Sequence, residues 1–156
     1  MYHRILLAYD GSIEGRRALR EGALLAKHCR ADVFLLSVIA TSAGMQIGES
    51  ALAGALAQEQ VTYRALLDEG VERLRAMGFE PVSRLVQGEP AQEIAAFARQ
   101  VSADLVVVGY RKQSMLARWW SGSAGASLSN YIGCSLLVAR KDFTDEAFAT
   151  ALHSAS

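Results

Sequence analysis

The chain contains 156 residues, 51% of them apolar, so we expect a single domain with a hydrophobic core. Its 16 Lys and Arg residues balance its 16 Asp and Glu residues, which gives no electrostatic reason to bind nucleic acid or an anionic membrane. No apolar run approaches the ~20 residues that span a bilayer, so we expect neither nucleic acid nor a membrane as a partner.

The first part of the chain predicts two buried strands around one helix. Residues Arg4 to Tyr9 form an apolar run that indicates the first strand, and Asp10-Gly11-Ser12 indicates a turn. Helical spacing of apolar residues then predicts a helix to about Cys29. A second buried strand is expected over Asp32 to Ala40.

The middle of the chain predicts a long helix and an edge strand. Helical periodicity extends from about Glu49 to Met77, where Gly78 is a typical stop. Residues Pro81 to Gln87 alternate and begin with proline, which favours a strand at the edge of a sheet. Gly88-Glu89-Pro90 then opens another helix, with Pro90 at its first position.

The last part of the domain contains the most apolar strand. Residues Asp104 to Gly109 predict a strand buried on both faces, followed by a helix from Ser123 to about Ile132 and a fifth strand, Cys134 to Ala139. Strands and helices thus alternate throughout, which predicts an α/β domain over residues 1–141 with an open parallel sheet and helices on both faces. The pattern alone does not give the order of the strands.

Residues 142–156 form a tail beyond this domain. Apolar side chains recur there at helical spacing, so a short amphipathic helix could dock on the body or on a partner chain. A frayed terminus fits the same residues equally well.

The segment after the fourth strand has the composition of a phosphate-binding loop. Glycines permit close approach of the main chain to a ligand, and a helix start presents free N–H groups to an anion. The candidate phosphate-binding residues are Gly109, Gly122, Ser123, Ala124 and Gly125.

This segment also resembles the nucleotide-binding loop of the universal stress protein family. That loop reads Gly-x-x-Gly, nine residues, then Gly-Ser or Gly-Thr. Here the first glycine of the pattern is Gly109, the nine residues are 113–121, and Gly122-Ser123 follows them. One departure is Lys112, which stands where the second glycine should be. The resemblance covers Ile5 to about Arg140 and includes the run from Ile5 to Ser12 and the tripeptide Gly88-Glu89-Pro90.

The resemblance implies a Rossmann-like sheet with strand order 3-2-1-4-5. Strands 1 and 4 would then be neighbours whose connections leave to opposite sides, which is where open α/β sheets bind ligands. It further implies ATP or a related adenine nucleotide at the carboxyl ends of these strands, with Mg²⁺ or Mn²⁺ on the phosphates. Besides the phosphate-binding residues, the residues implied to contact the nucleotide are Ala8, Tyr9, Asp10, Val38 and Val108. Lys112 is a further candidate because of its charge, not because of the resemblance.

Asp10 has two interpretations. An aspartate in a turn commonly forms the turn or caps the helix that follows. Beside a nucleotide, the same carboxylate would bond the ribose or hold the metal ion. Both interpretations remain open from the sequence.

Lys112 also permits two interpretations. A lysine at a position that needs positive φ adds strain of ~1 kcal/mol or more and could abolish nucleotide binding. Its ammonium group could instead pair with phosphate, and Arg111 and Arg118 lie in the same segment. The alternatives are therefore a nucleotide-binding signalling module and a family member that acts through protein contacts alone.

Enzymatic activity is not clearly indicated. The chain has no P-loop and no Gly-x-Ser-x-Gly turn, and no acid lies between Gly109 and Gly122 to act as a base. The third strand ends in Gln87-Gly88 without the acceptor aspartate of a phosphorelay receiver domain. A slow ATP hydrolase is the most that we expect.

The resemblance also implies a homodimer that forms through the last strand, here Leu136, Leu137 and Val138. Pairing would protect an apolar strand that otherwise lies exposed at the edge of the sheet. The two cysteines have no metal-ligand spacing, and no signal peptide precedes the first strand. We therefore expect a cytoplasmic protein.

Overall fold

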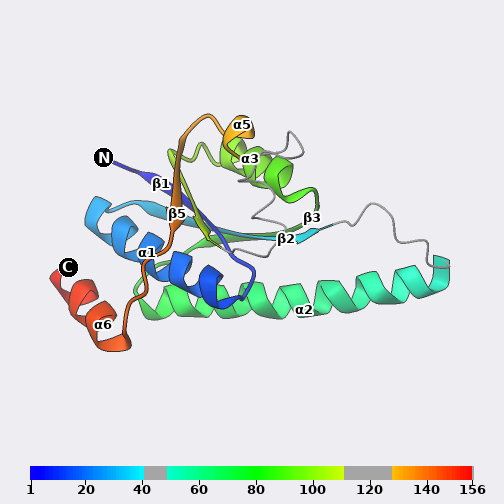
Figure 1. Ribbon diagram of the computed structural model, residues 1–156, viewed down its shortest axis with the longest axis horizontal. Coiled ribbons are helices and arrows are strands. Elements are labelled where there is room, and N and C mark those ends of the chain that lie inside the picture. The colour runs from blue at the N-terminus through cyan, green and yellow to red at the C-terminus, as the bar shows by residue number, and fades with distance from the viewer. Residues whose placement is uncertain (41–48, 111–127, 156) are drawn as a thin grey trace.

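The computed structural model describes residues 1–40, 49–110 and 128–155, without the side chains of residues 49–52. Its five strands pair in parallel in the order β3-β2-β1-β4-β5 (Figure 1). The strands are β1 (Arg4–Ala8), β2 (Asp32–Ala40), β3 (Val82–Gly88), β4 (Leu105–Gly109) and β5 (Ser135–Ala139). The predicted fold class and strand order are therefore confirmed.

Helices cover both faces of the sheet (Figure 1). One face carries α1 (Ile13–Cys29) and α2 (Glu49–Ala76), and the other carries α3 (Pro90–Gln100) and α5 (Leu128–Tyr131). The final helix, α6 (Asp145–Ser154), lies beside α1 rather than on the sheet. No helix in the described part of the chain is both long and apolar enough to cross a membrane.

The central strands supply the core on both sides of the sheet. In β1, Leu7 faces α1 and α2, whereas Leu6 faces α3 and α5, because successive side chains of a strand point to opposite faces. The same alternation places Val107 of β4 on the first face and Val106 on the second. All four side chains are at most 1% exposed, so the middle of the sheet is a rigid support for the loops at its ends.

Close packing of α1 on the sheet depends on Gly22. A β-carbon placed on Gly22 would lie 2.3 Å from Cδ2 of Leu7 and 3.5 Å from both Cγ atoms of Val107. A larger residue would push α1 away from β1 and β4. The position and tilt of α1, and with them the start of the helix at the carboxyl end of β1, are thus fixed by this contact.

The helix starts follow the expected chemistry. Ser12 caps α1, and its Oγ accepts the N–H of Gly15 at 2.9 Å. Glu89 caps α3 by accepting the N–H of Gln92 at 2.9 Å, and Pro90 occupies the first turn as predicted.

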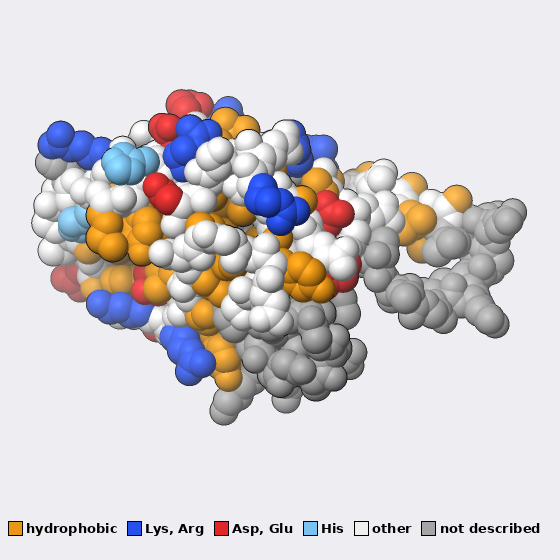
Figure 2. Space-filling model, turned by 90° about the horizontal axis from the view of Figure 1, so that it is seen from above, with side chains coloured by type: hydrophobic (Ala, Val, Ile, Leu, Met, Phe, Trp, Pro, Cys, Tyr) orange, Lys and Arg blue, Asp and Glu red, His pale blue; other side chains and the backbone are white. Residues whose placement is uncertain are grey.

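The long helix α2 is supported by the body along only part of its length. Leu67 and Leu74 are fully buried and Val71 nearly so, which places the second half of α2 on the sheet. The first half extends beyond the rest of the molecule (Figures 1 and 2), and Val61 within it is 66% exposed. The middle of α2 borders the groove described below.

Candidate functional site at the carboxyl ends of β1 and β4

The connections that follow β1 and β4 leave to opposite faces of the sheet. These strands are direct neighbours, with Ile5, Leu6 and Leu7 opposite Leu105, Val106 and Val107. The chain leaves β1 for α1 on one face, and the helix α5 after β4 lies on the other face (Figure 1). This is the topological switch point at which open α/β sheets bind ligands.

The turn after β1 is organised by Asp10. Its Oδ1 accepts the backbone N–H of Ser12 at 2.9 Å and the hydroxyl of Ser12 at 2.5 Å. Ser12 Oγ in turn accepts the N–H of Gly15, so one carboxylate orders the turn and the helix cap together. The structure therefore gives Asp10 the turn-forming role, while its half-buried position still borders the switch point.

Gly109 brings the end of β4 against the start of α1. A β-carbon on Gly109 would lie 2.5 Å from the carbonyl oxygen of Glu14 and 3.1 Å from the nitrogen of Gly15. Gly15 is itself close to the turn, since its own β-carbon would lie 2.5 Å from Asp10 Oδ1. The carboxyl ends of the two strands thus converge on the first turn of α1.

The backbone of Tyr9 is already engaged. Its N–H donates to the carbonyl of Leu36 at 2.9 Å, and its carbonyl accepts the hydroxyl of fully buried Ser37 at 2.7 Å. Only a second lone pair on the Tyr9 carbonyl remains for a ligand. The phenol hydroxyl is buried without a hydrogen bond of acceptable geometry among the described residues, although the phenol lies near enough to Arg16 to raise the pKa of that guanidinium.

The other predicted contacts on the strands differ in exposure. Ala8 and Val38 are half-buried on the face that carries α3. Val108 is fully buried in the same core cluster, so only its main chain could reach a ligand. Gly109 is the predicted site residue whose main chain lies directly at the convergence of the strand ends.

Five of the predicted site residues lie outside the described residues: Lys112, Gly122, Ser123, Ala124 and Gly125. The same applies to Arg111 and Arg118. The phosphate-binding half of the site therefore remains a prediction, and the described half consists of the turn after β1 and the end of β4.

Sequence reasoning did not associate Tyr63 with this site. Burial raises the pKa of the Tyr63 phenol, and the negative charge of nearby Asp10 raises it further. The phenol is therefore neutral at pH 7 and can donate a hydrogen bond. No local pattern in the sequence indicates that α2 passes the end of β1.

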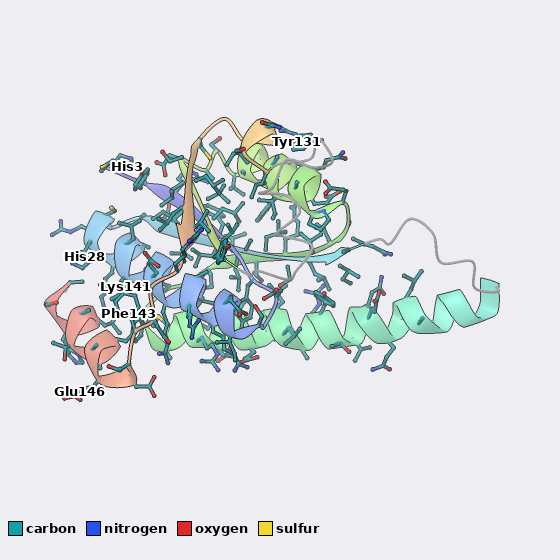
Figure 3. All side chains as sticks on the ribbon, in the orientation of Figure 1. His3, His28, Tyr131, Lys141, Phe143 and Glu146 are labelled. Atoms are coloured by element: carbon teal, nitrogen blue, oxygen red, sulfur yellow. The ribbon has the colours of Figure 1, made fainter. Side chains whose placement is uncertain are left out.

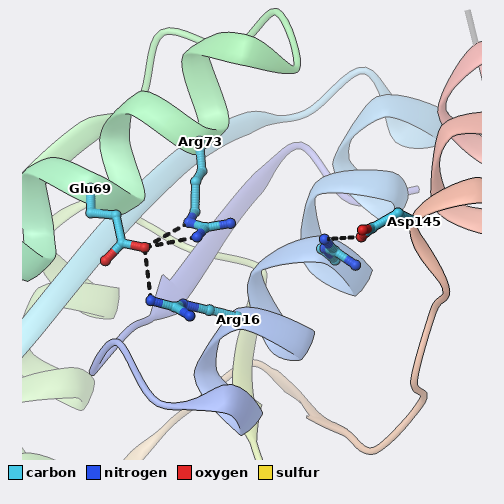
Figure 4. A network of polar contacts seen from close by, with 5 residues as sticks. Arg16, Glu69, Arg73 and Asp145 are labelled. Atoms are coloured by element: carbon cyan, nitrogen blue, oxygen red, sulfur yellow. Dashed lines mark hydrogen bonds and ion pairs between the residues drawn. The ribbon is translucent and has the colours of Figure 1, made fainter.

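The two helices beside the turn are joined by a charged network (Figure 4). Glu69 Oε1 of α2 accepts a hydrogen bond from the guanidinium group of Arg16 of α1 at 3.0 Å. It accepts another at 2.9 Å from Arg73, which lies one turn further along α2. All three side chains are between one third and one half exposed, so their pairing adds little stability. The network joins α1 to α2 near the end of β1.

A separate groove of about 690 Å³ lies between the middle of α2 and the ends of β2 and β3. Ile39, Val61 and Gln87 are among its lining residues, and none of the predicted site residues lines it. It borders β2 and β3 rather than the switch point, so it is distinct from the candidate site.

The described residues contain no group of three or more His, Cys, Asp or Glu side chains that could hold a metal ion. Near the switch point, Asp10 is the predicted metal-binding residue. Mg²⁺ is commonly bound by one or two carboxylates together with substrate phosphates, and a single aspartate fits that mode.

A doubly wound α/β domain with a switch point between β1 and β4 belongs to the broad class of Rossmann-like folds. The sequence profile of the universal stress protein family matches residues 1–140. The chain belongs to the universal stress protein family.

Individual relatives agree with this assignment. A universal stress protein of Thermus aquaticus is 30% identical over 144 residues, which cover 90% of this chain and all of the relative. The universal stress protein YxiE of Bacillus subtilis is 28% identical over 151 residues, with coverage of 90% and 100%. The universal stress protein UspA of Lactobacillus plantarum has a similar structure, with a TM-score of 0.72, 20% identity, and coverage of 89% of this chain and 98% of that one.

Proposed function

We propose that this protein is an adenine-nucleotide-binding signalling module. ATP or a related nucleotide binds at the carboxyl ends of β1 and β4, and the bound state is transmitted through a change of conformation or of partner binding. The observation that carries the proposal is the convergence of Gly109, the Asp10 turn and the first turn of α1 at the switch point.

Solved relatives support an adenine ligand. Universal stress proteins similar to this chain have been crystallised with cAMP, with dAMP and, in the Arabidopsis thaliana protein, with AMP. Their sequence identities to this chain are 23%, 21% and 17%. All three ligands are adenine nucleotides with a single phosphate; dAMP lacks the 2′-hydroxyl of ribose and the phosphate of cAMP is cyclic, so the adenine base is the best-supported part of the proposal.

The phosphate contacts would come from the segment that follows β4. Gly122, Ser123, Ala124 and Gly125 would supply main-chain donors, and Lys112 would supply a cation to the phosphates. Mg²⁺ or Mn²⁺ would neutralise phosphate charge, and Asp10 would be the carboxylate that helps to hold the ion. Asp10 Oδ1 already accepts two bonds from Ser12, which argues against Asp10 as a base for rapid ATP hydrolysis.

Calorimetric titration with ATP, AMP and cAMP, each with and without Mg²⁺, tests the proposal. Two variants at position 112 identify the role of Lys112. Tighter binding by Lys112→Gly but not by Lys112→Ala means that backbone strain limits affinity. Weaker binding by both variants means that the ammonium group contacts phosphate.

The alternative within the family is a protein that has lost nucleotide binding and acts through protein contacts alone. Binding by Lys112→Gly but not by the unmodified chain would establish that loss. No binding of any of the three nucleotides to either protein would overturn the proposed function altogether.

We further propose a cytoplasmic homodimer that forms through β5. This strand ends the sheet on one side, and its Leu136, Leu137 and Val138 are only half-buried in the monomer. An unpaired apolar edge strand favours association with a second strand. Sedimentation of a Leu137→Lys variant tests this interface, because a charge there should shift the protein towards monomer.

A further inference from the structure

The C-terminal helix α6 is attached to the body without a core of its own. None of its residues from Asp145 to Ser154 is buried, although Thr144 caps the helix by accepting the N–H of Ala147 at 3.2 Å. The helix lies beside α1 (Figures 1 and 3). Its attachment must therefore come from contacts at the surface.

Two arginines of α1 make the charged contacts. Arg17 pairs with Asp142 at 2.8 Å. Arg20 pairs with Asp145 at 2.6 Å, and Figure 4 shows this contact at Asp145. The carboxylates are 69% and 89% exposed, and an exposed ion pair changes an equilibrium by at most about fivefold. A competing segment can thus displace α6 from α1 at small cost in free energy.

The side chain of Arg20 contacts three chemical groups of the tail at once. Besides Asp145, it donates to the carbonyl oxygen of Phe143 at 3.2 Å, and its guanidinium carbon lies 5.2 Å from the centre of the Phe148 ring. The two phenylalanine rings pack edge to face at 6.3 Å. This combination of carboxylate, carbonyl and aromatic ring selects for an acidic segment that carries aromatic residues.

The same face of α1 has polar atoms that the tail does not use. Arg17 Nε and Glu21 Oε2 are buried and have no hydrogen-bond partner among the described residues. They lie one helical turn apart, and Arg17 is also the residue that pairs with Asp142. A better-matched segment could satisfy this donor and this acceptor, whereas α6 leaves both unsatisfied.

We propose that the α1 face around Arg17, Arg20 and Glu21 is a docking surface for an acidic, aromatic-bearing segment of a partner protein. The tail from Asp142 to Ser154 occupies this surface as an internal competitor. Because the tail is tethered, its high effective concentration keeps the surface closed to weak ligands. A partner binds only when its segment is better matched than the tail or when the tail is weakened.

A fluorescent peptide with the sequence of residues 141–155 serves as the probe, measured by anisotropy against the full chain. In the double variant Asp142→Asn/Asp145→Asn the tail is weakened while α1 is unchanged. We expect this variant to bind the peptide up to about 25-fold more tightly than the unmodified chain, since two exposed ion pairs no longer hold the tail. Binding should weaken with added salt.

Changes on α1 provide the specificity control. Adding Arg17→Ala and Arg20→Ala to the tail-weakened variant should abolish binding, with circular dichroism verifying the fold. Arg20→Glu should bind a peptide that carries Asp145→Arg better than it binds the unmodified peptide, a result that a merely structural arginine would not produce.

Equal affinity of the peptide for the tail-weakened and unmodified chains would overturn the proposal, as would binding that survives loss of both arginines. Sedimentation distinguishes a further outcome. If the unmodified chain forms a dimer that the peptide dissociates, the tail of a second copy is the occupant, and the proposal of a different partner protein is wrong.

Discussion

The backbone of Gly109, at the end of β4, packs closely against the backbone of Glu14 in the first turn of α1. A β-carbon on Gly109 would lie 2.5 Å from the carbonyl oxygen of Glu14 and 2.7 Å from its carbonyl carbon. The preceding residue, Val108, is fully buried, so β4 cannot easily shift to make room. Glycine at this position therefore permits the approach of the two strand ends that defines the candidate site.

Gly109→Ala should consequently lower the free energy of unfolding by about 1–3 kcal/mol, because the clash is with backbone rather than with a mobile side chain. Urea denaturation of both proteins measures this difference. Gly133→Ala is the matched control, since a β-carbon there meets no atom within 4 Å. Equal stability of the Gly109 and Gly133 variants would show that α1 adjusts freely.

A second glycine tests the packing of α1 on the sheet. Gly22→Ala places a methyl group against Leu7, where a β-carbon would lie only 2.3 Å from Cδ2. The gain of ~0.5–1 kcal/mol that alanine normally brings to a helix should be outweighed by overpacking, which costs about 1–3 kcal/mol. Thermal unfolding should show a lower midpoint for this variant.

The control for Gly22 is another helical glycine, Gly54, whose β-carbon would meet nothing within 4 Å. Gly54→Ala should cause no loss of stability, since it removes only the conformational freedom of glycine. A Gly22→Ala variant as stable as Gly54→Ala would contradict the close packing of α1 on Leu7.

Much of the fold could be predicted from the residues. Periodicity predicted each strand to within about one residue at either end, because buried apolar runs are a strong local signal. The order of the strands came from the family resemblance instead, since which strands pair depends on contacts between distant parts of the chain. The sequence did not decide between a docked helix and a frayed terminus for the residues of α6, because the arginines of α1 that hold this helix are far away in sequence.

Less of the site could be predicted. Asp10 and Gly109 were placed correctly at the ends of strands because strand boundaries are visible in the sequence, whereas the prediction that these two strands are neighbours came from the family resemblance. The engagement of the Tyr9 backbone by Leu36 and Ser37 was not visible, because it depends on the register between β1 and β2. Tyr63 was missed for the same kind of reason, since the effect of Asp10 on its pKa depends on how distant parts of the chain fold together.

Ser37 provides a test of this hidden contact. It is the fully buried polar residue of β2, and its hydroxyl donates to the Tyr9 carbonyl at 2.7 Å. Ser37→Ala should destabilise the fold by about 0.5–1.5 kcal/mol through loss of this bond. The measurement is urea denaturation, with Ser83→Ala as control because Ser83 is exposed on neighbouring β3 and should change stability by less than about 0.5 kcal/mol. Indistinguishable variants would mean that the bond contributes nothing.

Asp104, which precedes β4, is hydrogen-bonded to the start of β1. This contact should make the stability of the fold depend on pH. The Asp104 carboxylate accepts the N–H of His3 at 2.8 Å and that of Arg4 at 3.1 Å. Burial raises the pKa of Asp104, but these donors together with its own N–H lower it by more, so the net shift is downward.

A carboxylate whose pKa is lower in the folded state stabilises the protein above its unfolded pKa of about 3.9, and this contribution is lost as pH falls through that range. Asp104→Asn should therefore reduce the free energy of unfolding at pH 7 by roughly 0.5–1 kcal/mol, a modest value because the side chain is 37% exposed. Denaturation experiments at pH 7, 5 and about 3 should show that the difference in the free energy of unfolding between the unmodified protein and the variant becomes smaller at acid pH. A gap of constant size across the series would mean that the bonds to His3 and Arg4 do not depend on the charge of Asp104, and that the lowered pKa plays no part in holding β1 against β4.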